Sequence, residues 1–137
     1  MTFHNDLAFG KKYEAIATEY MLDDETLVEP APDGLFKGWD FRTNKYKYEV
    51  KSDRLAYKYG SRTMFIEYEC SGQPSGISST ESDFWFYFMV HPDGTFKAFC
   101  IPVDTLKEAC KGCVSKAGGD GWRSRGYIVP VNPAFLV

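Results

Sequence analysis

Apolar and polar residues follow two different periods along this chain, and each period predicts a different element. Residues 6–21 carry apolar side chains spaced four, three and four positions apart, which is the spacing of one face of an α-helix. Residues 45–51 alternate strictly between charged and apolar side chains, as in a half-buried β-strand. Residues 84–91 form a continuous, largely aromatic run, which is typical of a central strand.

Shorter elements fill the rest of the chain. We expect further strands over residues 35–42, 63–70, 95–101 and 127–131. A second helix is predicted over 102–110, with a proline near its start and a glycine after its end. Turn-rich connectors are predicted over residues 23–34, 52–62, 71–83 and 117–125. This order predicts an α/β or α+β fold with a central mixed β-sheet flanked by helices, in a single domain over residues 1–137.

The segment from residue 38 to residue 51 carries the candidate chemistry. A turn-prone pair at 43–44 folds its first half back along its second half, which brings Asp40 near Glu49. Glu49 and Lys51 point to the same side of the strand because its side chains alternate. Two carboxylates and one ammonium group at a sheet edge would suit a hard cation such as Mg²⁺. The same alternation is also typical of the solvated face of an ordinary antiparallel strand.

Asp40 followed by Glu49-Val50-Lys51 resembles the signature of the PD-(D/E)XK nuclease superfamily, with Trp39 in place of the proline. The preceding helix is similar to the first helix of that superfamily, and residues 65–80 are similar to small phage-type members related to Holliday junction resolvases. The resemblance implies a restriction-endonuclease-like core. It also implies a metal-dependent endonuclease, a hydrolase that cleaves DNA phosphodiester bonds, in phage-type DNA recombination.

The resemblance also implies a role for each residue of the signature. Asp40 and Glu49 would hold Mg²⁺ or Mn²⁺, with the backbone carbonyl of Val50 as a further ligand. Lys51 would position or activate the attacking water. The first helix of the superfamily often contributes an acidic residue, and Glu14 is the candidate for that role here, in contact with the metal directly or through water.

Other acidic positions have two interpretations each. Glu14 borders the apolar stripe of its helix, so it would otherwise reach solvent or pair with Lys11 or Lys12. Glu67 and Glu69 are expected to share one side of their strand, either joining the acidic cluster or lying on a solvent-facing edge. The sequence around Glu67 is similar to the third strand of the family, which favours Glu67 as the residue that extends the cluster or orients the lysine.

Charge is distributed unevenly along the chain. The formal net charge is −3, yet residues 37–65 contain eight basic and three acidic residues. A local basic patch is what a phosphate-binding surface requires, although a solubilising hairpin would show the same charge. Hydroxyl groups and amides in the connector over 71–83 could also contact phosphate. The candidate DNA-binding residues are Lys45, Lys47, Arg54, Lys58, Arg62, Gln73 and Ser78.

Several other classes of site lack support in the sequence. Cys110 and Cys113 have the spacing of a zinc half-site, but no second pair follows, so we expect four reduced cysteines. The N-terminal residues do not read as a secretory signal and no apolar run is long enough to span a bilayer. We therefore expect a cytoplasmic protein, in a bacterial or phage-infected cell, with no membrane partner.

The resemblance to resolvases implies branched double-stranded DNA as the partner and a homodimer that cleaves two strands. Three other functions are compatible with the sequence. The first is a restriction- or repair-type nuclease that uses the same site on linear or nicked DNA. The second is a DNA-binding protein that keeps the fold without cleaving, and the third is a mixed α and β domain with no site.

Overall fold

The computed structural model describes residues 3–21, 26–31, 38–118 and 123–137, which form an α+β fold with two β-sheets and two α-helices. The first sheet is mixed and has the strand order β1-β2-β3-β6-β7, in which β3 and β6 run parallel and the other neighbours antiparallel. Its strands are β1 (Leu27–Pro30), β2 (Phe41–Thr43), β3 (Lys47–Asp53), β6 (Phe84–Val90) and β7 (Phe96–Pro102).

The second sheet is antiparallel throughout and has the order β5-β4-β9-β8. Its strands are β4 (Thr63–Cys70), β5 (Gln73–Pro74), β8 (Ser115–Gly118) and β9 (Ser124–Pro130). Single-turn helices connect or follow the strands, namely η1 (Ala56–Tyr59), η2 (Gly76–Ser78) and η4 (Pro133–Phe135).

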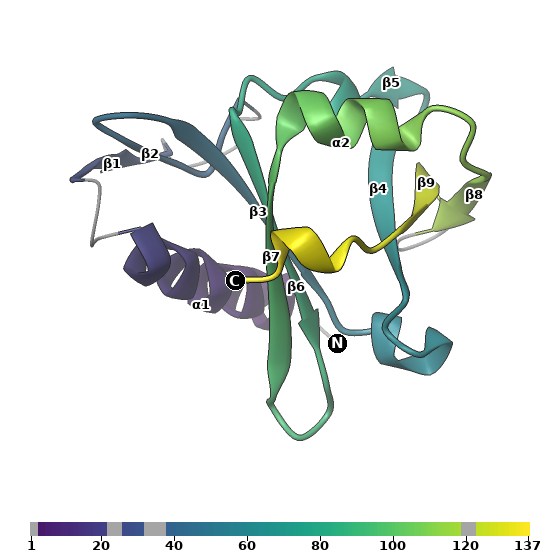
Figure 1. The fold of residues 1–137 in the computed structure, drawn as a ribbon, viewed down its shortest axis with the longest axis horizontal. Coiled ribbons are helices and arrows are strands. Elements are labelled where there is room, and N and C mark those ends of the chain that lie inside the picture. The colour runs from purple at the N-terminus through teal and green to yellow at the C-terminus, as the bar shows by residue number, and fades with distance from the viewer. Residues whose placement is uncertain (1–2, 22–25, 32–37, 119–122) are drawn as a thin grey trace.

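The first sheet is covered on both faces. Helix α1 (Phe3–Met21) lies on one face, and the second sheet lies with helix α2 (Val103–Cys110) on the other (Figure 1). Alternate residues of β6 therefore enter two different cores. Phe86 and Phe88 pack with Tyr13 of α1, whereas Trp85 and Tyr87 pack toward the second sheet. Burial on both faces explains why β6 is apolar at every position.

Most of the predicted elements are confirmed within a few residues. The strand over 63–70 has the predicted bounds, and the helix predicted from residue 6 begins earlier, at Phe3. The strand predicted over 35–42 is described only from residue 38, and its strand part is limited to Phe41–Thr43. No described helix is long and apolar enough to cross a membrane.

The predicted central mixed sheet is present, but two features of the sheets differ from the prediction. A second, antiparallel sheet forms because β4 pairs with β9 and not with a strand of the first sheet, so that Met64 and Ile66 pack in the core between the two sheets. The loop predicted over 117–125 is partly strand, since β8 ends at Gly118 and β9 begins at Ser124. Strand β8 has β9 as its partner, and β9 lies between β8 and β4, a pairing that local sequence does not reveal.

Candidate active site

The β2–β3 hairpin fixes Asp40 beside β3. The two strands pair only at Phe41 with Tyr48 and at Arg42 with Lys47, so β2 stops short of the middle of β3. The backbone amide of Asp40 donates to the carbonyl of Tyr48 at 2.8 Å. The next amide along the edge of β3, that of Val50, donates to the Oδ2 atom of Asp40 at 2.7 Å. The aspartate side chain therefore takes the place of a missing strand partner.

Glu49 and Lys51 lie on one face of β3, as the alternation predicts, and this face looks toward the second sheet. Lys51 Nζ is 3.3 Å from Glu49 Oε1. The Glu49 side chain is 12% exposed and that of Lys51 is 39% exposed, so the lysine side chain is the more exposed of the two. The ammonium also lies 5.7 Å from the ring centroid of Trp85, which pairs with Glu49 in the sheet.

Burial and mutual repulsion raise the pKa values of the carboxylates in this region. Burial raises the pKa of Glu49 to about 7; Lys51 opposes this rise and the charge of Asp40 adds to it. Burial also raises the pKa of Asp40, against the hydrogen bond from Val50. For Lys51, burial alone would lower the pKa, but Glu49, Asp40 and Glu67 together outweigh it and raise the pKa. The predicted signature residues therefore form one electrostatic cluster.

Glu14 joins this cluster from the other side of the sheet. Burial raises the pKa of Glu14, the charge of Asp40 raises it further, and Lys11 and Lys51 lower it. Its carboxylate is also 3.8 Å from Lys11 Nζ, so the ion pair anticipated as its alternative partner is present. The pairing with Lys11 is therefore confirmed, and the carboxylate is still close enough to Asp40 to respond to its charge, while a role of Glu14 at a metal ion stays a prediction.

The side chain of Glu67, on β4 of the second sheet, lies close enough to the cluster to affect Lys51, whereas that of Glu69 points to the other side of the strand. The pairing of β4 with β9 shifts register between them, with Glu67 opposite Gly126 and Glu69 opposite Arg125. Because directly paired residues point to the same side, Glu67 and Glu69 point to opposite sides, and the expectation that they share a side is wrong. Glu67 accepts a hydrogen bond of 2.9 Å from Ser75 Oγ and contributes to the raised pKa of Lys51.

The carboxylates of this cluster could hold a magnesium-type ion only together with water and substrate. Within the described parts of the chain, no three His, Cys, Asp or Glu side chains converge so as to hold a metal ion by themselves. Mg²⁺ is commonly bound by only one or two carboxylates, with waters and substrate phosphate as its remaining ligands. Asp40, directly before β2, and Glu49, on β3, are the two carboxylates that could form such a pair. The donor set therefore fits Mg²⁺ or Mn²⁺ as an ion shared between protein, water and substrate.

Trp85 is a neighbour of the site that the sequence did not single out. Its side chain is fully buried and its Nε1 atom has no hydrogen-bond partner among the described residues. The aromatic run over 84–91 marked Trp85 only as a core residue. Its place opposite Glu49 depends on the parallel pairing of β3 with β6, which no local pattern reveals.

The basic residues flank the acidic cluster in two groups. Lys45 and Lys47 lie at the hairpin turn, and the Lys47 amide donates to the Asp83 carboxylate at 2.9 Å. The other group lies around η1, beyond the opposite end of β3, at a distance of about 20 Å along a strand of this length. This second group contains Arg54, Lys58 and Arg62. The predicted single basic patch is therefore divided, with Glu49 and Lys51 between its two parts.

The three basic candidates around η1 differ in how freely they can bind phosphate. The Arg54 guanidinium lies 4.4 Å from the ring centroid of Phe9 on α1, so Arg54 packs against the helix. Lys58 and Arg62 are exposed, as are Gln73 and Ser78 on the second sheet and η2. The exposed cations are free to move toward a phosphate, whereas Arg54 would first have to leave an aromatic ring.

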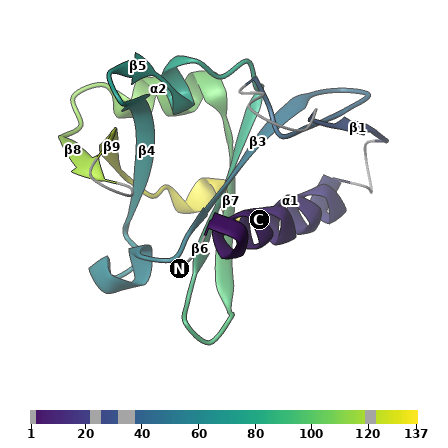
Figure 2. The same cartoon turned by 180° about the vertical axis from the view of Figure 1, so that it is seen from behind.

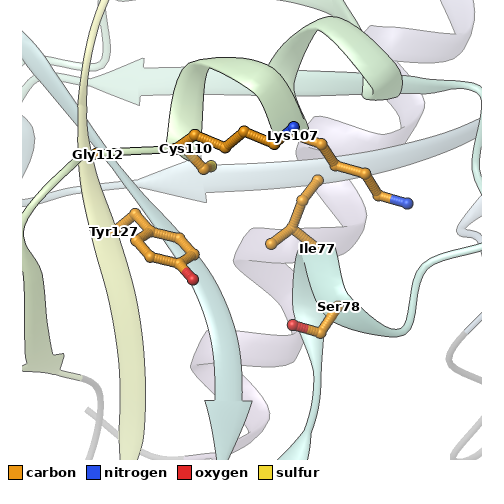
Figure 3. Close-up of a pocket in the computed structure, with 7 residues that line it drawn as sticks. Ile77, Ser78, Lys107, Cys110, Gly112 and Tyr127 are labelled. Atoms are coloured by element: carbon orange, nitrogen blue, oxygen red, sulfur yellow. The ribbon is translucent and has the colours of Figure 1, made fainter.

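A pocket of about 330 Å³ lies apart from the acidic cluster, between η2, α2 and β9 (Figure 3). It is lined by Ile77, Ser78, Lys107, Cys110, Lys111, Gly112 and Tyr127. Burial raises the pKa of the Cys110 thiol to about 11, so this thiol stays protonated. All four cysteines are free thiols in the structure, and Cys113 donates to the carbonyl of Ala109.

Comparisons with known proteins leave the family open. No family model matches the chain. No curated protein matches it either. The nuclease resemblance therefore rests on the residues of the signature and on the geometry around them.

Proposed function

We propose that this protein is a Mg²⁺- or Mn²⁺-dependent endodeoxyribonuclease of the PD-(D/E)XK type. The observation that carries the proposal is the hydrogen bond from the Val50 amide to Asp40, which fixes one carboxylate against the strand that bears Glu49 and Lys51. A solvated strand face would not need two partly buried carboxylates with raised pKa values beside the ammonium group of Lys51. A mixed sheet with α1 on one face is compatible with the restriction-endonuclease-like core.

Each residue of the cluster then has a defined task. Asp40 and Glu49 would hold the ion, with the carbonyl of Val50 next to them and Glu14 as a supporting carboxylate. When bound, the ion neutralises phosphate charge and lowers the pKa of its water. In the reaction a water oxygen bonds to phosphorus and one ester P–O bond breaks; the water loses a proton and the leaving oxygen gains one.

The pKa of Lys51 decides between two roles for this residue. Because the neighbouring carboxylates raise its pKa, Lys51 stays protonated at neutral pH. A protonated lysine cannot accept the proton of the attacking water, but it can orient that water and stabilise the negative charge that develops on the phosphate. We therefore assign Lys51 to positioning and charge stabilisation.

The substrate is DNA, contacted by the basic residues on both sides of the cluster. Cleavage of branched DNA by a homodimer remains the preferred form of the proposal, because residues 65–80 resemble resolvase-like members of the superfamily. A restriction- or repair-type nuclease would use the same cluster on linear or nicked DNA. A DNA-binding protein without cleavage would use only the basic residues.

Cleavage assays with supercoiled plasmid and a four-way junction, in Mg²⁺ and in EDTA, test the proposal. We expect Mg²⁺-dependent cleavage that Lys51→Met reduces by about two orders of magnitude or more. Lys97→Met on β7 is the matched control, because Lys97 is an exposed lysine outside the cluster, and it should cleave like the wild type. Absence of cleavage by folded wild type, or full activity of Lys51→Met, would overturn the assignment. Preference for the junction over linear duplex separates a resolvase from a general nuclease.

A further inference from the structure

The turn that follows β3 exposes an unusual set of large side chains. Leu55 is 58% exposed, Tyr57 38% and Tyr59 73%, so three large apolar side chains within five positions face solvent. Among the described residues, Tyr59 is the most exposed large apolar side chain. Single exposed apolar residues need no explanation, but a cluster of them indicates a surface that contacts something.

This exposure is built into the fold, because the turn is firmly held. Asp53 Oδ1 accepts hydrogen bonds from the amides of Leu55 and Ala56 at 2.8 and 3.0 Å. The buried hydroxyl of Tyr87 donates to Asp53 Oδ2 and accepts from the amide of Phe65 at 3.0 Å. The turn is thus tied to β6 and β4 at once, while Ala56 is buried beneath it.

The charge of the turn indicates the chemistry of its partner. Residues 54–62 contain three basic residues and no acidic ones. Two of the three, Lys58 and Arg62, are exposed. Aromatic rings framed by cations suit a ligand with flat, stackable faces and an anionic backbone. DNA meets both requirements, provided that the faces of its bases are accessible.

The turn also adjoins the candidate active site along the chain. Asp53, which caps the turn, is two residues after Lys51 on β3. Figure 2 shows the turn at the lower left, where β3 ends and β4 begins, close to the start of α1. The turn that carries Tyr59 thus leads directly out of the strand that carries Glu49 and Lys51.

We propose that η1 and its flanking residues, with Tyr59 at the centre, stack on unpaired bases next to the cleaved phosphate. This inference rests on the proposed nuclease function and names its substrate class: DNA with unpaired or splayed nucleotides, as in gaps, flaps and branch points. In a continuous duplex the base faces are covered by their neighbours, and a base must be unstacked before its face is exposed. Tyr59 therefore discriminates against intact duplex DNA.

Binding in EDTA tests this inference without cleavage. The probes are a duplex with a short gap, in which 2-aminopurine is an unpaired base, and the same duplex with the gap filled. Fluorescence anisotropy gives the dissociation constant, and 2-aminopurine quenching reports stacking. We expect the wild type to bind the gapped probe more tightly and to quench its fluorescence.

Substitutions at one position identify the contact. Tyr59→Ala should weaken binding of the gapped probe by about tenfold and abolish quenching, because stacking on an aromatic ring contributes about 1–3 kcal/mol per base. Tyr59→Phe should retain both, since the ring and not the hydroxyl stacks. Tyr20→Ala on α1 is the control, because Tyr20 is also an exposed tyrosine, at 42%.

Equal binding of the gapped probe by Tyr59→Ala and wild type would overturn the inference. It would also fall if Tyr59→Ala converted a dimer into a monomer in sedimentation, because the exposed side chains would then form a contact between copies. Failure of the nuclease proposal gives a different result. If the protein binds the gapped probe and quenches its fluorescence but cleaves no DNA in Mg²⁺, the stacking surface is supported and the nuclease assignment is wrong.

Discussion

The carboxylate of Asp40 and the backbone amide of Val50 are joined by a hydrogen bond of 2.7 Å. Without Asp40, that amide would lie at an edge of β3 that β2 does not reach. The same bond holds a carboxylate beside Glu49, so the residue that completes the sheet edge also completes the candidate metal site. Structural and chemical roles of Asp40 can be separated by the choice of substitution.

Asp40→Asn should keep the fold and lose cleavage. The amide oxygen of asparagine can still accept the hydrogen bond from Val50, whereas alanine leaves that amide unpaired. We expect Asp40→Ala to lower the free energy of unfolding by about 1–3 kcal/mol and Asp40→Asn to change it much less. Urea denaturation measures the difference. An Asp40→Asn protein that cleaves DNA at the wild-type rate would show that the negative charge is not needed.

Glu49 should destabilise the metal-free protein above neutral pH. Its pKa is about 7 in the fold against an ordinary value of 4.5, so the folded state binds the proton more tightly than the unfolded state does. Ionisation of Glu49 therefore costs folding free energy only at higher pH. The cost is absent below the pKa of the unfolded state, grows as the pH rises between the unfolded and folded pKa values, and is complete above the folded pKa. Glu49→Gln removes it.

In EDTA at about pH 8, Glu49→Gln should raise the free energy of unfolding by up to about 3 kcal/mol, and at about pH 4 it should have little effect. Glu19→Gln is the matched control, because Glu19 is an exposed glutamate on α1. Urea denaturation at both pH values gives the comparison. A Glu49→Gln protein less stable than wild type at the higher pH would mean that Glu49 is ionised and well compensated in the fold.

Mg²⁺ should stabilise the wild-type protein more at higher pH. An ion that binds only the folded state stabilises it by about 2.7 kcal/mol at a hundred times its dissociation constant. Binding must displace the proton of Glu49, so the affinity should rise as the pH approaches and passes about 7. Thermal unfolding with Mg²⁺ and with EDTA measures the shift, which Asp40→Asn and Glu49→Gln should reduce or remove. A shift of the same size in both variants would place the ion elsewhere.

Gly76→Ala should disturb the second sheet at Glu67. Gly76 has φ +53°, and a Cβ atom there would lie 2.1 Å from the carbonyl oxygen of Glu67. Gly72 has φ +80° with nothing near its Cβ position, so Gly72→Ala reports the backbone strain alone. We expect Gly72→Ala to cost about 1–2 kcal/mol and Gly76→Ala clearly more. Equal costs in urea denaturation would mean that the neighbouring backbone yields without penalty.

Local pattern was enough to predict much of the site, because its central features are local. Strict alternation over 45–51 predicts that Glu49 and Lys51 share a face, and the turn at 43–44 predicts that Asp40 returns toward them. The register between β2 and β3 was not readable, and the bond from Val50 to Asp40 depends on it. The sequence therefore predicts the hairpin but not the hydrogen bond from the Val50 amide to Asp40.

Features set by distant pairing were predicted less well. Glu67 and Glu69 obey the same alternation as the residues of β3, yet a register shift against β9 turns them to opposite sides. Strand β8 is short and glycine-containing, and it is a strand only because β9 pairs with it. The position of Trp85 opposite Glu49 likewise follows from a parallel pairing between strands far apart in the chain.

Cleavage of supercoiled plasmid in Mg²⁺ by Glu49→Gln, compared with wild type, tests the central claim most directly. The account predicts a variant that is more stable than wild type at about pH 8 and yet cleaves at least about a hundredfold more slowly, because the carboxylate that destabilises the fold is the one that holds the ion. A Glu49→Gln protein that is folded and cleaves as fast as wild type would contradict it.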